Sequence, residues 1–261
     1  MNMTVDARWL ASHLDDENLI IIDSRGSISF RFSHIKNAIP LSIEKVISTD
    51  ENGSHLVIAP QAAERIFTSM GIDDTKVVIV YGEYPDPSLA RIVWTLIYFG
   101  HNNVKILDIG FESWLQSGYP VTKEFKSNDL SPKSSRGFVA HIKTTERADA
   151  QFICQEKGKP ETTIIDARTP QEHFHARIPG SILHNYEEGI GDMGKMIKDV
   201  EELKQDFEKI GITHDKQIIC YCHSGIRAAH TYLQLKQAGF DNVRLYDGSI
   251  IDWAKRKYPL G

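Results

Sequence analysis

Residues 217–239 read QIICYCHSGIRAAHTYLQLKQAG, and this stretch decides the fold of the second half of the chain. Residues 217–221 form a short apolar run, which is typical of a buried strand. Residues 228–238 have a helical pattern that ends at Gly239, since a glycine often follows the last turn of a helix. Residues 222–227 are then a tight strand-to-helix turn. In α/β sheets, ligands bind beyond the carboxyl ends of strands, so the turn is a candidate site.

The composition excludes several classes of protein. The 261 residues are 41% hydrophobic and 25% charged, which is ordinary for a globular protein with a core of its own. The net charge of −5 gives no reason to expect nucleic acid or an anionic membrane as a partner. Three cysteines are too few for a disulfide framework, and the first residues lack the pattern of a signal peptide. We therefore expect free thiols and a cytoplasmic location.

The chain also repeats itself. MGIDDTKVVIVYG (70–82) matches IGITHDKQIICYC (210–222), and GHNNVKILDIGFESW (100–114) matches GFDNVRLYDGSIIDW (239–253). Two shorter pairs, LIIIDSR with TIIDAR and HIKNAI with RIPGSI, follow in the same order in both halves. Four blocks in register indicate that a domain has been duplicated.

We predict two domains, residues 1–122 and 137–261, joined by a polar linker of residues 123–136. In each half, short β-branched runs such as residues 77–81 alternate with longer helical patterns such as residues 88–100. Strands that alternate with helices predict an α/β fold, here two domains that each hold a mainly parallel sheet flanked by helices.

Two cysteines mark the end of the strand predicted at 217–221, and one of them has the surroundings of a nucleophile. Cys220 matches an apolar residue of the first half, so we interpret it as a core residue that faces away from Cys222. Cys222 stands where backbone N–H groups of the turn and the helix N-terminus attract an anion. Arg227 and His223 add positive charge, and Gly225 lets the backbone curl where a side chain would obstruct it. Such surroundings favour the thiolate, which is the nucleophilic form of cysteine.

These residues resemble a known family. The arrangement strand–Cys-x-x-Gly-x-Arg–helix, followed by NVRLYDGSIIDW, resembles the active-site half of a rhodanese. The tandem layout, the Asp-x-Arg after the first long strand of each half and the RIPGSI segment resemble the two-domain members, so the resemblance covers nearly the whole chain. In that family the N-terminal domain is inactive and the C-terminal domain carries the cysteine. Gly82 stands where the second half has Cys222, which implies that the first half shapes and supports the site.

The resemblance implies a sulfurtransferase that works by double displacement. The Cys222 thiolate attacks the sulfane sulfur of a donor such as thiosulfate, sulfite leaves, and a persulfide remains. A thiophilic acceptor then removes that sulfur; the candidates are cyanide in an assay, a cellular thiol, and thioredoxin or another acceptor protein. The amides from His223 through Ser224, Gly225 and Ile226 to Arg227 hold the anionic sulfur. Neither a metal nor an organic cofactor is implied.

The same resemblance leaves two donors open. Members that prefer thiosulfate carry cationic residues after the cysteine, as His223 and Arg227 are here. Arg177 is expected as a second anion contact, with a solvated surface arginine as the alternative. Members that prefer 3-mercaptopyruvate carry a serine two positions after the cysteine, as Ser224 is here, and a histidine partner that we match to His34. We favour thiosulfate and keep 3-mercaptopyruvate as the alternative.

Three charged residues that precede the turn are assigned to structure rather than chemistry. We expect Asp166 and Arg168 to form a pair that anchors the strand end beneath the turn, and Glu172 to be structural as well.

Two other functional classes are weighed against the transferase. A cysteine, a loop and an arginine before a helix also occur in phosphatases and arsenate reductases. Protein tyrosine phosphatases, however, have five residues between Cys and Arg, whereas four lie between Cys222 and Arg227. A non-catalytic scaffold module is the second alternative, and it fits the half with Gly82 but not the half with Cys222.

Overall fold

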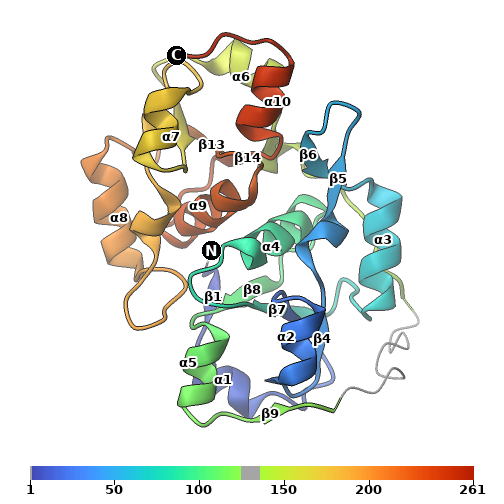
Figure 1. Ribbon diagram of the computed structural model, residues 1–261. Coiled ribbons are helices and arrows are strands. Elements are labelled where there is room, and N and C mark those ends of the chain that lie inside the picture. The colour runs from blue at the N-terminus through green and yellow to red at the C-terminus, as the bar shows by residue number, and fades with distance from the viewer. Residues whose placement is uncertain (1, 125–135) are drawn as a thin grey trace.

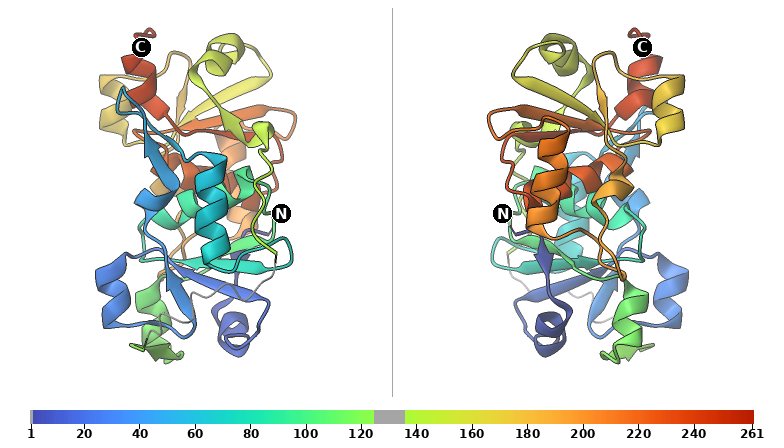
Figure 2. Two further views of the ribbon diagram at one scale, coloured as in Figure 1. Left: turned by 90° about the vertical axis from the view of Figure 1, so that its right-hand side faces the viewer. Right: turned by 90° about the vertical axis from the view of Figure 1, so that its left-hand side faces the viewer.

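The computed structural model describes residues 2–124 and 136–261 and consists of two α/β domains stacked end to end (Figures 1 and 2). The first domain lies in the lower half of Figure 1 and the second in the upper half. The linker predicted at residues 123–136 falls almost entirely outside the described residues, so the domain boundaries stay a prediction.

A five-stranded sheet with the order β1-β8-β7-β2-β4 forms the centre of the first domain, and all its pairs are parallel. Its strands are β1 (Thr4–Val5), β2 (Leu19–Asp23), β4 (Ala38–Pro40), β7 (Val77–Tyr81) and β8 (Val104–Leu107). Helices α3 (Pro60–Ser69) and α4 (Ser88–Tyr98) pack on one face. Helices α1 (Ala7–Ser12), α2 (Ser27–Phe32) and α5 (Phe111–Gln116) pack on the other. Two antiparallel pairs lie outside the sheet: β3 (His34–Ile35) with β9 (Val121–Thr122), and β5 (Ile47–Thr49) with β6 (His55–Val57), the latter preceded by the 3-10 turn η1 (Ile43–Val46).

The second domain repeats this plan strand for strand, with a parallel sheet in the order β10-β14-β13-β11-β12. Its strands are β10 (Arg147–Ala148), β11 (Thr162–Asp166), β12 (Ile182–Leu183), β13 (Gln217–Tyr221) and β14 (Val243–Tyr246). Helices α8 (Val200–Lys209) and α9 (Ile226–Gln237) cover one face. Helices α6 (Ala150–Glu156) and α10 (Ser249–Lys255) cover the other, and α7 (Pro170–His175) follows β11. Two 3-10 turns, η3 (Thr144–Glu146) and η4 (Tyr186–Gly189), complete the domain. The prediction of two α/β domains with mainly parallel sheets is confirmed.

Both sheets are buried on both faces, which explains why their strands read as continuous apolar runs. On β7, Val78 and Val80 belong to the core beneath α4, whereas Ile79 and Tyr81 belong to the core on the opposite face. Helix starts also follow local signals. The Asp6 carboxylate accepts the Arg8 and Trp9 amides at the start of α1.

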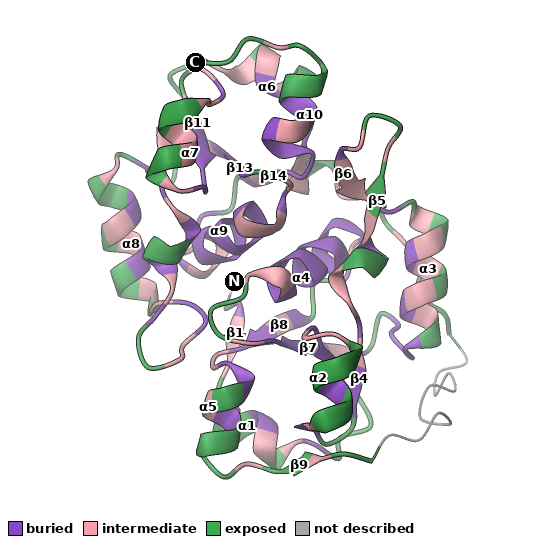
Figure 3. Cartoon of the chain, viewed as in Figure 1, coloured by how far each residue is buried: buried purple, intermediate pink, exposed green. Residues whose placement is uncertain are grey.

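Helices α4 and α9 pack against each other between the two sheets and join the domains (Figure 1). Both are buried along most of their length (Figure 3). One apolar cluster contains residues of both helices and extends into both domains, so the two halves share a core.

Each domain also sends one segment across to the other. The β5–β6 hairpin of the first domain reaches the second, where the Val57 amide donates to Asp247 Oδ2 at 2.7 Å and Ser54 Oγ donates to Asp252 Oδ1 at 3.1 Å. In return, the Met196 amide of the second domain donates to the Asp108 carbonyl at 2.8 Å. The two segments lie at matching positions of the repeat. Each domain therefore contacts the other in a similar way.

No helix in the described parts of the chain is both long enough and apolar enough to cross a membrane.

Candidate active site

The turn that holds Cys222 is shorter than the sequence indicated. Strand β13 ends at Tyr221 and α9 begins at Ile226, so Cys222–Gly225 form the turn and Arg227 lies in the first turn of the helix. The prediction that the helix starts at residue 228 is therefore wrong by two residues. The reason is Gly225, which precedes the helix with a left-handed φ of 83°. The sulfur lies at the carboxyl end of a central strand, beside the N-terminus of a 12-residue helix.

Cys222 lies at the buried base of this turn, and the residue is only 1% exposed. The Gly225 amide donates to Cys222 Sγ at 3.1 Å. Ser249 lies beside the same residue: its hydroxyl oxygen accepts the Cys222 amide at 3.0 Å and is 3.9 Å from Sγ. A main-chain donor therefore faces the sulfur, as an anionic sulfur requires.

Cys220 is a core residue, but the expectation that it faces away from Cys222 is wrong. Both sulfurs belong to the same apolar cluster, because residues two apart on a strand point to the same side. The two cysteines differ in their position along the strand. Cys220 is within the strand and burial raises the pKa of its thiol far above the ordinary value, whereas Cys222 lies past the strand end among donors.

Helix α10 supports the turn from outside. The Ile250 amide donates to the Cys222 carbonyl at 3.2 Å, and the Ser249 hydroxyl donates to the Tyr246 carbonyl at 2.8 Å. Sequence analysis missed Ser249. A signal was present, since Ser249 matches Gly110 in the repeat and the two halves therefore differ beside the turn.

Arg227 is held by Glu172 in a two-pronged ion pair. Its Nη1 and Nη2 atoms lie 2.7 and 2.8 Å from the two carboxylate oxygens. Hydrogen bonds from Arg227, with further ones from Thr169, lower the pKa of Glu172 to about 2. Glu172 also closes a capping box with Thr169 at the start of α7, so one carboxylate ties α7 to α9.

The pair of Asp166 and Arg168 lies beneath the turn, as expected. Arg168 donates to both Asp166 oxygens at 2.8 and 2.6 Å, and the Tyr221 hydroxyl donates to Asp166 Oδ2 at 2.7 Å. Burial opposes the charge of Asp166, but Arg168, His173 and Tyr221 outweigh it and lower the pKa of this carboxyl. The same pattern of Asp, Arg and Tyr recurs in the first domain at Asp23.

Among the described residues, the hydrogen bonds of Arg177 and His34 go to segments other than the turn, and their donor-binding roles stay predictions. They occupy matching positions of the repeat, and each makes a contact four residues back: Arg177 Nη1 donates to the His173 carbonyl at 3.4 Å, and His34 Nδ1 contacts the Phe30 carbonyl at 2.8 Å. His223 is exposed at the turn, while Ser224 is half-buried there.

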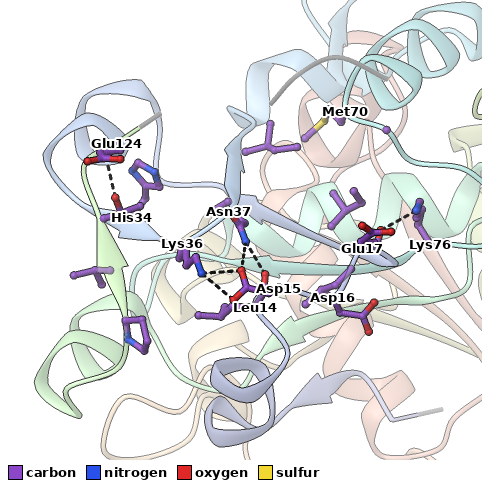
Figure 4. A pocket seen from close by; sticks show the side chains of 18 residues that line it. Leu14, Asp15, Asp16, Glu17, His34, Lys36, Asn37, Met70, Lys76 and Glu124 are labelled. Carbon is purple, nitrogen blue, oxygen red and sulfur yellow. Dashed lines mark hydrogen bonds and ion pairs between the residues drawn. The ribbon is translucent and has the colours of Figure 1, made fainter. Parts of the chain in front are cut away.

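His34 instead lines a cavity of about 570 Å³ in the first domain (Figure 4). Its lining comes from residues 14–124, and the Asp15 carboxylate accepts hydrogen bonds from Lys36 and Asn37. The cavity touches the first residues of β2 rather than the carboxyl end of the sheet, so it is separate from the cysteine turn.

The first domain reaches the cysteine turn through Arg91 of α4, another residue that sequence analysis missed. This side chain is fully buried, and its Nη1 donates to the Gly225 carbonyl at 3.3 Å. Its Nη2 lies 3.6 Å from Asp247 Oδ2, and Asp247 in turn accepts Arg147 Nε at 2.8 Å. The signal in the sequence was a lone arginine within the apolar helix SLARIVWTLIYFG.

A side chain at the equivalent place in the first domain would crowd its neighbours. A Cβ on Gly82 would lie 2.7 Å from Ser24 Oγ and 3.0 Å from Leu89 Cδ2. In the repeat, Ala167 and Ala228 match Ser24 and Leu89. Two alanines therefore open the space that Cys222 occupies.

Fold and site together define a class: a duplicated α/β protein with one cysteine in a donor-lined turn at the carboxyl end of a central strand. The family model described as the Rhodanese-like domain matches residues 6–117 and 150–256. The chain belongs to the rhodanese family.

Curated relatives resemble the chain along nearly its whole length. A "Putative thiosulfate sulfurtransferase" of Haloferax volcanii is 26% identical, with 97% of this chain and 93% of the relative covered. The "3-mercaptopyruvate sulfurtransferase" of Escherichia coli is 29% identical, with 97% and 95% covered.

Solved structures show the same fold. The 3-mercaptopyruvate sulfurtransferase SseA of Escherichia coli superposes with a TM-score of 0.84 at 27% identity, over 95% of this chain and 99% of that one. The anaerobic ergothioneine biosynthesis enzyme of Chlorobium limicola has a TM-score of 0.86 at 19% identity, over 99% of this chain and 69% of that one, and shows the fold alone.

Proposed function

We propose that the protein moves a sulfane sulfur from thiosulfate to a thiophilic acceptor through a persulfide on Cys222. The observation that carries the proposal is the Gly225 amide directed at Cys222 Sγ from 3.1 Å, beside a helix N-terminus. An amide so placed stabilises negative charge on whichever sulfur occupies the turn.

In the first half-reaction the Cys222 thiolate attacks the outer sulfur of thiosulfate. A new S–S bond forms, the old S–S bond breaks, and its electron pair leaves with sulfite. In the second, an acceptor thiolate or cyanide attacks the outer persulfide sulfur, and the electron pair returns to Cys222. No oxidant, metal or organic cofactor takes part, and the kinetics are ping-pong.

The second candidate donor is 3-mercaptopyruvate, with the same persulfide. Ser224 favours it, since this half-buried residue follows the cysteine by two positions at the mouth of the turn. One curated relative carries that activity in its name, and the Arabidopsis thaliana relative, at 28% identity, carries both donors in its name.

For the acceptor we propose a small thiol or a carrier protein such as thioredoxin, in the cytoplasm. The three cysteines are free, as a reducing compartment requires. A relative of Thermus thermophilus at 25% identity is named "Sulfur carrier protein TtuD", which supports a protein acceptor.

We propose donor-binding roles for His223, Ser224, Ile226 and Arg227 because they lie in the turn or directly after it. Arg177 and His34 stay predictions from the resemblance. Comparing kcat/KM for the two donors in Arg177→Ala, Ser224→Ala and His34→Ala tests each role. A selective loss with 3-mercaptopyruvate in Ser224→Ala would favour that donor.

The proposal itself is tested by mass spectrometry after treatment with thiosulfate. We expect one added sulfur atom, mapped to the peptide of Cys222, and its removal by cyanide. Cys222→Ser should take up no sulfur, whereas Cys220→Ala, which alters the neighbouring buried thiol, should still take it up. Absence of sulfur on wild-type Cys222 would favour the scaffold module. Aryl-phosphate hydrolysis that is lost in Cys222→Ser would favour the phosphatase.

A further inference from the structure

Arg91 brings a buried charge from the domain without a cysteine to the turn that has one. Its guanidinium is fully buried, bonds to the Gly225 carbonyl and is close enough to Cys222 to interact with it electrostatically. Gly225 is also the residue whose amide faces the sulfur. Arg91 therefore binds the carbonyl of the same residue whose amide donates to Cys222 Sγ.

The guanidinium is only partly satisfied. Among the described residues, Arg91 Nε and Nη2 donate no hydrogen bond, and the 3.6 Å from Nη2 to Asp247 is an ion-pair distance only. Burying a guanidinium with unused donors costs free energy, and Arg91 has two such donors. An unmet buried cation is typical of a site that develops negative charge.

Counting the charges around the turn leaves a net positive charge behind the sulfur. Asp247 is shared between two cations, Arg91 and Arg147. In front of the sulfur, by contrast, Arg227 is neutralised by Glu172. Burial lowers the pKa of Arg91, but an arginine starts so far above neutrality that it remains charged.

Neighbouring titratable groups do not cancel this charge. Arg147 also interacts with the Asp149 carboxylate, but Asp149 is exposed at the start of α6, so water screens its charge. Beside Cys222, the Cys220 thiol is kept neutral by burial. His223 is exposed at the turn, and the hydroxyls of Tyr98 and Tyr186, near Arg147 and Arg227, have raised pKa values and stay uncharged at neutral pH. Arg91 is thus the buried charge that the second domain leaves uncompensated.

The other half of the molecule, which has no cysteine, lacks this arrangement. In the repeat, His230 of α9 matches Arg91, is equally buried, and interacts with Asp86 in the first domain's turn. Burial lowers the pKa of His230 to about 4, so it is neutral at pH 7. Asp108 matches Asp247, but no arginine in the described part of the chain pairs with it, and burial raises its pKa to about 6.

On the basis of the proposed function, we propose that Arg91 is a positioning residue for sulfur transfer, which acts across the domain interface by holding the Gly225 peptide against the sulfur and by placing an uncompensated positive charge behind it. The first domain then supplies part of the electrostatics of the second domain's chemistry. The thiolate and the persulfide are both anions, so both half-reactions depend on this charge.

The test compares Arg91→Met and Arg91→Lys with His230→Gln, the matched change on the other side of the interface. Methionine is unbranched and fills a similar space, and Asp247 keeps Arg147 and the Val57 amide as partners, so the variant should fold. Three quantities are measured: kcat/KM for thiosulfate, sulfur uptake at Cys222, and the pH midpoint of Cys222 alkylation by iodoacetamide, followed on its own peptide.

We expect Arg91→Met to lower kcat/KM at least about tenfold, since it removes the support of a donor and a charge. The midpoint of alkylation should rise by about one pH unit, the usual effect of losing a nearby opposite charge. Arg91→Lys should keep the midpoint of the wild type but lose part of kcat/KM, because an ammonium cannot hold Gly225 and face Asp247 together. His230→Gln should resemble the wild type in all three measurements.

Wild-type midpoints and kcat/KM in Arg91→Met would overturn the proposal. So would a fall in kcat/KM without a change in the midpoint, since a purely structural role predicts that result. If Arg91→Met does not fold, Arg91→Lys decides, and undiminished turnover there would overturn the proposal. Failure of the wild type to take up sulfur would instead refute the proposed function.

Discussion

Gly225 is the residue on which the geometry of the turn depends. Its φ of 83° lies in the left-handed region, and a Cβ there would collide with the Arg91 guanidinium and come within 2.9 Å of the Asp247 Cα. Both the conformation and the space therefore require glycine, and its amide faces the sulfur.

Replacing Gly225 by alanine should remove the reactive geometry. We expect sulfur transfer to fall at least about a hundredfold, because small displacements of a donor cost that much. Steady-state kinetics with thiosulfate and cyanide measure the effect.

Gly211 provides the matched control. Its φ of 78° is equally left-handed, but a Cβ there would meet nothing within 4 Å. Gly211→Ala should cost stability of roughly 1 kcal/mol and leave transfer unchanged. Equal turnover in the two variants would show that the crowding around Gly225 is irrelevant to the reaction.

For single residues, the sequence predicted the members of the local cysteine motif but missed contacts between residues far apart in the chain. Cys222, Gly225 and Arg227 lie within one strand–turn–helix, so their pattern was readable. The contact between Arg91 and Gly225 spans 134 residues of sequence, and no local pattern indicates it. His34 was matched by motif, whereas the structure gives its ring a contact with the Phe30 carbonyl.

Among the elements, α7 and α9 are coupled by one carboxylate. Glu172 caps α7 and holds Arg227 at the start of α9. The pKa of Glu172 is lowered from 4.5 to about 2 in the folded state. The contribution of its charge to stability is therefore present above about pH 4.5 and is lost as the pH falls toward 2.

Glu172→Gln should consequently destabilise the protein in a pH-dependent way. The difference in free energy of unfolding from the wild type should be largest near neutral pH and fall by roughly half by pH 3. Urea unfolding at several pH values measures it.

Glu208, an exposed carboxylate on α8, is the control. Glu208→Gln should differ little from the wild type at any of these pH values. A loss of stability in Glu172→Gln that stays constant with pH would contradict a role for the carboxylate charge.

The order and type of the elements were readable from hydrophobic periodicity, but the start of α9 was not. Its start is displaced to Ile226 because Gly225 reverses the chain earlier than the periodic apolar pattern suggests. The internal repeat was the most useful signal for the order of the elements, because the two halves could be compared with each other.

At the scale of the whole molecule, the core that the two domains share should determine how the protein unfolds. Trp94 of α4 and Leu233 of α9 belong to one buried cluster that extends from the first sheet to the second. Separating the halves would expose this apolar surface to water.

We therefore expect the two domains to unfold in one transition. Hydrogen exchange in increasing urea should show the peptides of β7 and β13 losing protection at the same denaturant concentration. Two separate midpoints would show that the interface contributes little. The sequence predicted the duplication but not this shared core, because nothing within one repeat specifies the surface it presents to the other.

The tight fit around Gly82 limits how a second reactive centre could be built into this protein. A thiol at position 82 would meet Ser24 and Leu89, where the other half has alanines. Introducing a cysteine there would therefore call for smaller side chains at positions 24 and 89 as well. The two halves thus differ in the packing around the site and not only in one residue, so exchanging their tasks would require concerted changes.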